Sequence, residues 1–251
     1  MNIIISPAKR MREDYDSLPF GGLPAFLPQT LQLYDYLRTL SPERLQELLA
    51  CNDKIAELNF RRYQNMAALR QRTPALFAYQ GIQYQYMGPN AFTDQQYAYL
   101  QTHLYIVSGF YGLLRPFDGI HSYRLEMQAH LRTDFCKNLY DFWGETLGSA
   151  LSQGKLVIDL ASEEYSKAAR QGISPDTRWV TVRFGEIQNG KLKEKGTQVK
   201  MARGAMVRYL AEHAVSEPEE MQGFSELGYH FDAQRSRENC LVFVKSPPEN
   251  G

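Results

Sequence analysis

The chain has little of what marks several common protein classes. It contains three cysteines in 251 residues, Cys51, Cys136 and Cys240, which are too few and too far apart for a disulfide framework or a CxxC zinc site. No apolar run approaches the ~20 residues that cross a membrane, and no basic lead precedes the short apolar stretch at the amino terminus. We therefore expect a cytoplasmic protein with reduced thiols and no membrane association.

Metal and cofactor motifs are also missing. No two of the histidines lie three or four positions apart, and none lies within four positions of a cysteine; they are His103, His121, His130, His213 and His230. The sequence has no GxGxxG fingerprint, no Walker loop and no GxSxG elbow. We expect neither a metal site nor a cofactor.

Net charge is absent too, because 28 Lys and Arg balance 28 Asp and Glu. The distribution is nevertheless uneven. Residues 178–208 hold eight basic and two acidic residues, a net +6, whereas residues 209–251 hold eight acidic and three basic residues, a net −5. A zero total therefore does not exclude a nucleic-acid partner, since folding can gather the basic segments on one surface.

The pattern of apolar residues predicts a single α+β domain over residues 1–251, a compact mixed sheet with surrounding helices. Strands are expected at 2–5, 76–79, 104–107, 156–160, 179–184 and 241–244. Three helices are expected before residue 67, the second of them capped by Ser41. A further helix is expected to begin with a capping box of Thr93 and Gln96, and others are expected at 139–151, from 162, and at 198–213. Asn189-Gly190 is the preferred dipeptide of a type I′ turn and predicts a hairpin.

A glycine segment follows the expected strand at 104–107. Gly109 and Gly112 leave backbone N–H groups uncovered by a Cβ, which suits close approach of an anion, and Arg115 adds a permanent charge. The arrangement resembles the hairpin of a helix-hairpin-helix element, whose loop amides hold a backbone phosphate. The alternative is a glycine turn required by packing alone.

The expected helix at 198–213 carries three basic residues on one broad face. These are Lys200, Arg203 and Arg208, and Arg is suited to phosphate because its planar fork donates two parallel hydrogen bonds. Gly204 costs about 1 kcal/mol in a helix interior relative to Ala, which indicates close packing or docking beside it. A solvated basic face is the alternative interpretation.

Two polar clusters could supply acid–base groups. They are Tyr123-Arg124-Leu125-Glu126 and Ser162-Glu163-Glu164-Tyr165-Ser166-Lys167. Glu126 and Glu164 could act as general bases, or they could be ion-pair partners that orient Arg124 and Lys167. Ser162 is also placed to cap the helix that follows it.

Across these segments the chain resembles the YaaA family of bacterial peroxide-stress proteins, nearly end to end. The blocks that carry the resemblance are Ile5-Ser6-Pro7-Ala8-Lys9, residues 108–118, Tyr123-Arg124-Leu125-Glu126-Met127, Leu139-Tyr140-Asp141-Phe142-Trp143, Leu160-Ala161-Ser162-Glu163-Glu164-Tyr165, Asn189-Gly190-Lys191, Lys200 with Ala202-Arg203-Gly204 and Arg208, and Gly228-Tyr229 with Phe231.

The resemblance implies a role in the response to hydrogen peroxide, linked to low free iron. It also implies a helix-hairpin-helix-like element in a basic cleft that binds double-stranded DNA. The candidate DNA-binding residues are Lys9, Gly109, Gly112, Arg115, Arg124, Lys167, Lys200, Arg203 and Arg208. Because backbone phosphates carry no base information, binding is expected to be largely independent of sequence.

A binding protein is favoured over an enzyme, but an enzyme remains the alternative. Such an enzyme would act on a nucleotide or a nucleic-acid end in the same cleft, with Glu126 or Glu164 as general base. Direct iron chelation is the weakest interpretation, since no ligand spacing supports it.

Overall fold

A central, mostly parallel sheet organises the chain in this computed structural model, which describes residues 1–16, 18–66 and 71–246. Its strand order is β11-β12-β9-β8-β1-β5-β6, with β10 paired to β9. The strands are β1 (Asn2–Ile5), β5 (Leu104–Ser108), β6 (Gly112–Leu114), β8 (Leu156–Asp159), β9 (Arg178–Gln188), β10 (Lys191–Lys193), β11 (Tyr229–Phe231) and β12 (Cys240–Lys245).

The middle strands run parallel because helices cover both faces of the sheet. β1 pairs in parallel with β5 and with β8, so that Ile3 lies between Leu104 and Ile158. Every residue of β1 is buried, which fits a strand covered on both sides and accounts for its unbroken apolar run. Within this sheet, as far as the structure describes it, only the strands added at its edges pair antiparallel, and these are β6, β10 and β11.

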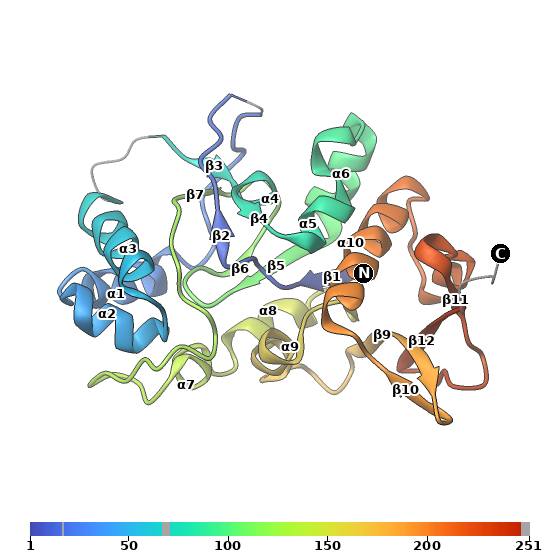
Figure 1. Cartoon of the computed structure of the whole chain (residues 1–251). Coiled ribbons are helices and arrows are strands. Elements are labelled where there is room, and N and C mark those ends of the chain that lie inside the picture. Colours follow the sequence, from blue (N-terminus) through green and yellow to red (C-terminus); the bar gives the residue numbers. More distant parts are fainter. Residues whose placement is uncertain (17, 67–70, 247–251) are drawn as a thin grey trace.

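Helices lie on both sides of this sheet (Figure 1). They are α1 (Leu27–Leu37), α2 (Pro42–Leu49), α3 (Asp53–Asn65), α4 (Ala75–Ala78), α5 (Ile82–Met87), α6 (Asp94–His103), α7 (Leu139–Trp143), α8 (Thr146–Ser152), α9 (Glu163–Arg170) and α10 (Gly196–Glu212), with short 3-10 helices at Pro89–Ala91, Pro218–Gly223 and Glu226–Gly228. α5, α6 and α10 pack together, and α8 packs on α9. The expected mixed sheet with surrounding helices is confirmed.

Several local predictions are also confirmed. Ser41 caps α2 by accepting a hydrogen bond from the Arg44 N–H at 3.4 Å, and Thr93 and Gln96 form a capping box at the start of α6. Asn189 and Gly190 adopt φ of 51° and 74° in the turn between β9 and β10. These caps and this turn depend on residues only a few positions apart, so the sequence alone predicts them.

Two predicted elements are wrong. The expected strand at 76–79 is the helical turn α4, whose first N–H groups, of Ala75 and Leu76, donate to the carbonyls of Asp118 and Pro116. All four residues of α4 are buried, and a short apolar run does not distinguish a strand from a buried turn. The expected helix at 139–151 is divided into α7 and α8, because Gly144 adopts a φ of +45° between them.

Two small ladders fold the amino-terminal segment against the helices above the sheet. β2 (Arg10–Met11) pairs antiparallel with β4 (Tyr79–Gln80), and β3 (Thr73–Pro74) pairs with β7 (Gly119–Ile120). The β2–β4 ladder holds the residues that follow β1 beside the start of α5. This arrangement positions one wall of the site described next.

Candidate functional site

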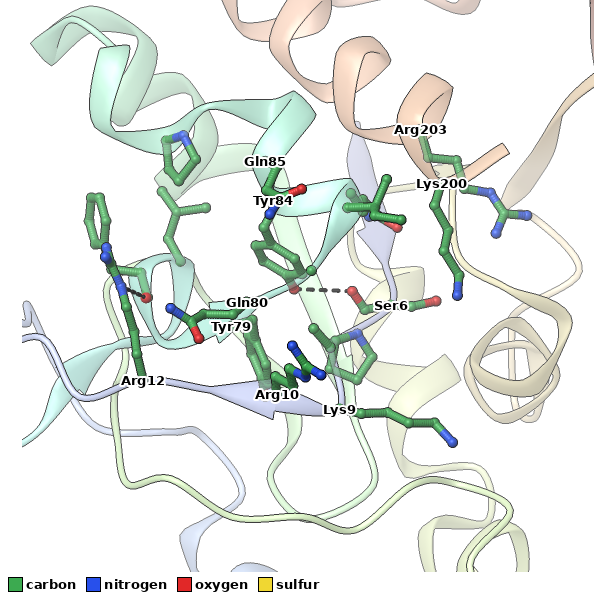
Figure 2. Close-up of a pocket in the computed structure, with 18 of the residues that line it drawn as sticks. Ser6, Lys9, Arg10, Arg12, Tyr79, Gln80, Tyr84, Gln85, Lys200 and Arg203 are labelled. Carbon is green, nitrogen blue, oxygen red and sulfur yellow. Dashed lines mark hydrogen bonds between the residues drawn. The ribbon is translucent and has the colours of Figure 1, made fainter. Parts of the chain in front are cut away.

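A cleft of about 940 Å³ opens at the carboxyl ends of β1 and β8. The chain adds β5 on one side of β1 and later returns to add β8 on the other side, so the strand order reverses at β1. Open α/β sheets bind ligands where the strand order reverses in this way, at the carboxyl ends of the strands. The segments after β1 and β8, together with α5, α10 and residues 123–126, line the cleft (Figure 2).

Two serines join the strand ends at the base of this cleft. The Ser162 N–H donates to Ser6 Oγ at 2.8 Å, and Ser6 Oγ donates to Ser162 Oγ at 3.1 Å. Ser162 therefore makes no side-chain capping bond to α9, contrary to the expectation from the sequence. The phenol of Tyr84 on α5 donates to the Ser6 carbonyl at 3.0 Å, which attaches α5 to the same point (Figure 2).

Asp159, the last residue of β8, holds the turn that leads to Ser162. It is 2% exposed and accepts hydrogen bonds from the Ala161 N–H at 3.0 Å, from Ser166 Oγ and from Trp179 Nε1 at 3.2 Å. Burial raises the pKa of this carboxyl, although its hydrogen bonds oppose the shift. These hydrogen bonds therefore fix the carboxyl end of β8 beneath the cleft.

Basic side chains outnumber acidic ones in the lining. Two of its charged residues are the carboxylates Glu126 and Glu164, and the other six are Lys9, Arg10, Arg12, Arg124, Lys200 and Arg203. Four of these six, Lys9, Arg124, Lys200 and Arg203, were candidates from the sequence. They come from three distant segments, and folding brings them together.

The cations in the lining differ in how far they are neutralised. Lys9 Nζ lies 3.1 Å from Glu126 Oε1, and Arg124 Nη2 lies 2.9 Å from the same oxygen. Arg10, Lys200 and Arg203, in contrast, form no ion pair within the described part of the chain. Lys200 is exposed and extends into the cleft beside Arg203 (Figure 2).

Three polar atoms in the lining are buried without a hydrogen-bond partner among the described residues. They are Gln83 Nε2, Glu126 Oε2 and Arg203 Nε. Burial lowers the pKa of the Arg203 guanidinium, while Asp159 and Glu194 raise it. Because nearly all buried polar groups in folded proteins are paired, these three atoms distinguish the wall of the cleft from most of the described core.

The surroundings of the Glu164 carboxylate in this cleft raise its pKa. Burial raises the pKa of Glu164, and the negative charge of Glu126 raises it further. The Gln128 N–H donates to Glu164 Oε1 at 3.1 Å, and this hydrogen bond opposes the rise. Lys9 lies close enough to lower the pKa again. Lys9 therefore lies near both carboxylates of the cleft, Glu126 and Glu164.

The remaining candidate cations from the sequence lie outside the cleft lining. Arg115 donates to the carbonyls of Gln101 and Thr102 at the end of α6, at 3.0 and 2.7 Å, and stacks on a tyrosine ring. Lys167 Nζ lies 4.9 Å from the centroid of the Tyr140 ring, and Arg208 pairs with Glu212 at 2.7 Å. Each of these residues has a local structural partner.

The glycine segment differs from the expected helix-hairpin-helix-like element. Gly109 lies in the buried turn that follows β5, and Gly112 is the first residue of β6, so the segment joins two strands and not two helices. A Cβ on Gly109 would lie 2.5 Å from the Leu125 carbonyl oxygen, and one on Gly112 would lie 2.9 Å from the Trp143 ring. Packing therefore accounts for both glycines, which is the alternative that the sequence left open.

The close packing expected beside Gly204 is also observed, because a Cβ there would lie 2.1 Å from the Gln83 carbonyl oxygen on α5.

Among the lining residues that sequence reasoning missed, three carry charged or unpartnered polar groups, namely Arg10, Arg12 and Gln83. Arg10 and Arg12 form a basic run with Lys9 directly after the first strand, and this run was an available signal. Gln83 gave no signal, because a glutamine in a short helix is ordinary until burial makes it unusual.

The described residues hold no group of three or more His, Cys, Asp or Glu that could bind a metal ion. No helix in the same ranges is long and apolar enough to cross a membrane. The three cysteines are free.

Fold and site together define a mixed α/β protein with a cation-lined cleft at the point where its strand order reverses. Residues 1–235 match the family model described as peroxide stress protein YaaA, and the chain belongs to this family. It is 47% identical over 250 residues to a UPF0246 protein of Desulfitobacterium hafniense, covering 99% of this chain and all of the relative. It is 48% identical over 246 residues to a UPF0246 protein of Lachnoclostridium phytofermentans, covering 98% and 96% of the two chains.

Proposed function

We propose that this peroxide-stress family member binds double-stranded DNA through backbone phosphates in the cleft and so helps limit iron-dependent damage. The observation that carries the proposal is the cleft lining, in which six Lys and Arg accompany two Glu on a chain with no net charge. Lysine and arginine side chains supply most of the affinity for a phosphate backbone. A phosphate-bearing polymer is the ligand that this lining matches best.

Three cations are available for phosphates without breaking an ion pair. Arg10, Lys200 and Arg203 come from β2 and α10, and Lys9, in the segment between β1 and β2, has 68% of its side chain exposed. Contacts of this kind position a protein on the duplex but read no bases. Binding is therefore largely independent of DNA sequence.

The link to iron follows from the same electrostatics. Duplex DNA carries condensed counterions, which are released when Lys and Arg neutralise its phosphates. Ferrous ions held at the backbone are among these counterions when free iron is present. Covering phosphates therefore moves iron away from the sites where peroxide would convert it into a damaging reagent.

A salt titration of duplex binding tests the proposal. If about four phosphates are neutralised, the logarithm of the binding constant falls with the logarithm of salt concentration at a slope of about −3.6. Fluorescence anisotropy of a labelled duplex from 50 to 300 mM salt measures it, with ~50 mM as the low-salt reference. Absence of binding at low salt, or affinity that does not respond to salt, contradicts the proposal.

The second candidate function is an enzyme acting on a nucleotide or a nucleic-acid end in the same cleft. The observation in its favour is the raised pKa of Glu164 beside Glu126, since a general base works best when its pKa lies near the working pH. Glu126→Gln and Glu164→Gln, tested separately on nucleotides and DNA ends, decide this case. Turnover by the wild type that either substitution abolishes supports an enzyme, and the absence of turnover removes it.

A further inference from the structure

A second hollow, of about 410 Å³, continues the wall of the cleft. Residues 123–126 line the cleft, and the residues that follow them, 127–132, line the hollow. Where the two meet, the Gln128 N–H donates to Glu164 Oε1 at 3.1 Å, and Glu164 itself lines the cleft. The rest of the lining comes from the beginning of α7 and the residues just before it, namely Lys137, Asn138 and Tyr140. The cleft and the hollow therefore share one stretch of chain.

The hollow is lined by basic side chains and, within the described ranges, by no carboxylate. Arg132, Lys137 and His130 are all exposed there, and no ion pair joins any of them to another described residue. Lys167 Nζ lies 4.9 Å from the centroid of the Tyr140 ring, so a further positive charge stands over a ring that lines the hollow. Exposed cations without a carboxylate partner are available to an anion.

Carboxylates close to this segment lie outside the lining of the hollow, and they are Asp134, Asp141, Glu163 and Glu164. Two of them are held by backbone N–H groups: that of Lys137 donates to Asp141 Oδ2 at 2.9 Å, and that of Gln128 donates to Glu164 Oε1. These hydrogen bonds occupy the carboxylates without using a basic side chain. The hollow therefore differs from the β9–β10 hairpin, where two cations each pair with a glutamate.

The spacing of the two regions fits a single duplex. Arg132 follows Glu126 by six positions, and six residues span at most about 20 Å. B-DNA rises about 3.4 Å per base pair, so both regions lie within about six base pairs of one another along a backbone. In Figure 1, α7 and the β9–β10 hairpin lie on opposite sides of α9. A duplex that runs from the cleft to the hollow therefore leads away from the hairpin.

We infer that the hollow is a second phosphate-binding surface, over which the backbone of a duplex continues when it leaves the cleft; the inference rests on the proposed DNA binding. Arg132 and Lys137 donate to phosphate oxygens, with His130 and Lys167 beside them. Phosphate contacts position a duplex without reading its bases. The hollow thus fixes the direction in which the DNA crosses the protein, and not its sequence.

Neutralising the two cations tests the inference on a duplex of about 24 base pairs, which covers both regions. The double variant Arg132→Gln/Lys137→Gln loses two phosphate contacts. We therefore expect the slope of the logarithm of the binding constant against the logarithm of salt concentration to become shallower by about 1.8. At ~0.1 M salt we expect the affinity to fall at least about tenfold.

The matched control removes the same charge from the hairpin. Lys191→Gln/Lys193→Gln changes two exposed side chains of β10, and we expect it to retain the wild-type slope and affinity. The Arg132 and Lys137 side chains are exposed as well, so both double variants should unfold at the wild-type temperature. Equal losses of slope in the two double variants, or no loss in either, overturn the inference.

The outcomes separate this inference from the proposed function. If the wild type binds no duplex at ~50 mM salt, the proposed function fails. If it binds with a steep salt dependence that Arg132→Gln/Lys137→Gln does not reduce, DNA binding in the cleft stands and the inferred path is wrong. Two duplexes bound per chain would make the hollow a separate site and would also overturn the inferred path.

Inorganic phosphate distinguishes a DNA backbone from a free anion as the ligand of the hollow. Calorimetric titration with inorganic phosphate is made on the wild type and on Arg132→Gln/Lys137→Gln. If phosphate binds the wild type and not the variant, while both retain the same slope on the duplex, the hollow holds a free anion and the inference is wrong. A difference in slope on the duplex, without measurable binding of inorganic phosphate, is the expected result.

Discussion

The positive side chains of the cleft have different surroundings from those of the neighbouring β9–β10 hairpin. Around the hairpin and the end of α10, three cations each have their own carboxylate: Arg183 pairs with Glu194 at 3.0 Å, Lys195 with Glu186 at 2.7 Å, and Arg208 with Glu212 at 2.7 Å. In the cleft, Arg10, Lys200 and Arg203 have none among the described residues.

This difference shows that a count of charges along the chain does not identify the site. The segment with the largest positive excess contributes only Lys200 and Arg203 to the cleft. Its acidic residues, although few, lie next to the hairpin cations and neutralise them locally. In the cleft, Glu126 pairs with Lys9 and Arg124, and Arg10, Lys200 and Arg203 keep no carboxylate partner among the described residues.

The largest expected effect is a loss of stability, and it is measured by replacing one glycine in each region with alanine. Gly204→Ala places a Cβ 2.1 Å from the Gln83 carbonyl oxygen and forces α10 away from α5, so we expect the free energy of unfolding to fall by about 3 kcal/mol. Gly190→Ala meets nothing within 4 Å but strains a φ of +74°, which costs about 1 kcal/mol. Urea unfolding of both variants measures the difference. Equal losses would mean that the α5–α10 contact is not tight.

Charge reversal compares the two regions by DNA affinity. Lys200→Glu places a negative charge in the cleft, and we expect duplex binding to weaken about fiftyfold, or ~2.3 kcal/mol. Lys191→Glu changes the net charge equally at the exposed hairpin and is the matched control. Anisotropy titrations at one fixed salt concentration measure both, and equal weakening would show that net charge, not the cleft, controls binding.

The two regions should also respond to pH with opposite signs. Burial raises the pKa of Glu164 in the cleft, whereas Lys195 lowers the pKa of Glu186 in the hairpin. The Glu164 contribution to stability is therefore fully present at low pH and lost as pH rises through its folded pKa, while that of Glu186 is lost as pH falls through its own. Thermal unfolding of Glu164→Gln and Glu186→Gln as a function of pH tests the two directions. At neutral pH we expect the wild type to be less stable than Glu164→Gln and more stable than Glu186→Gln.

Protonation of Glu164 also removes a negative charge from the lining of the cleft in which we propose that phosphates bind. Its Coulomb energy at about 4 Å in water is ~1 kcal/mol, so DNA binding should strengthen about fivefold as Glu164 takes up its proton. The Glu164→Gln variant should lack this part of the pH dependence. Identical pH profiles of the two proteins would contradict the assignment.

The smallest effect is expected at a neutralised cation of the hairpin. Arg183→Ala removes an ion pair with Glu194 between largely exposed side chains, which costs at most about 1 kcal/mol of stability. We expect duplex affinity to change less than about twofold, because a paired surface cation contributes little to the cleft. A loss comparable to that of Lys200→Glu would place the DNA on the hairpin instead.

Part of the site could be predicted from the sequence. Lys9, Arg124, Lys200 and Arg203 were candidates and line the cleft, as do Glu126 and Glu164. Arg115 was a candidate for the same reason and instead caps the carbonyl end of α6. Sequence alone cannot separate the two outcomes, because an arginine donates equally well to a phosphate and to a helix carbonyl.

The sequence by itself determined the local devices: the Ser41 cap, the Thr93 capping box, the Asn189-Gly190 turn and the buried run of β1. Their energies arise between residues a few positions apart, so pattern and spacing are sufficient. Only the tertiary structure decided which cations remain unpaired, and which atoms of Gln83, Glu126 and Arg203 are buried without partners. Burial and pairing depend on groups distant in sequence, and these meet only after the sheet has ordered β8 and β5 on either side of β1.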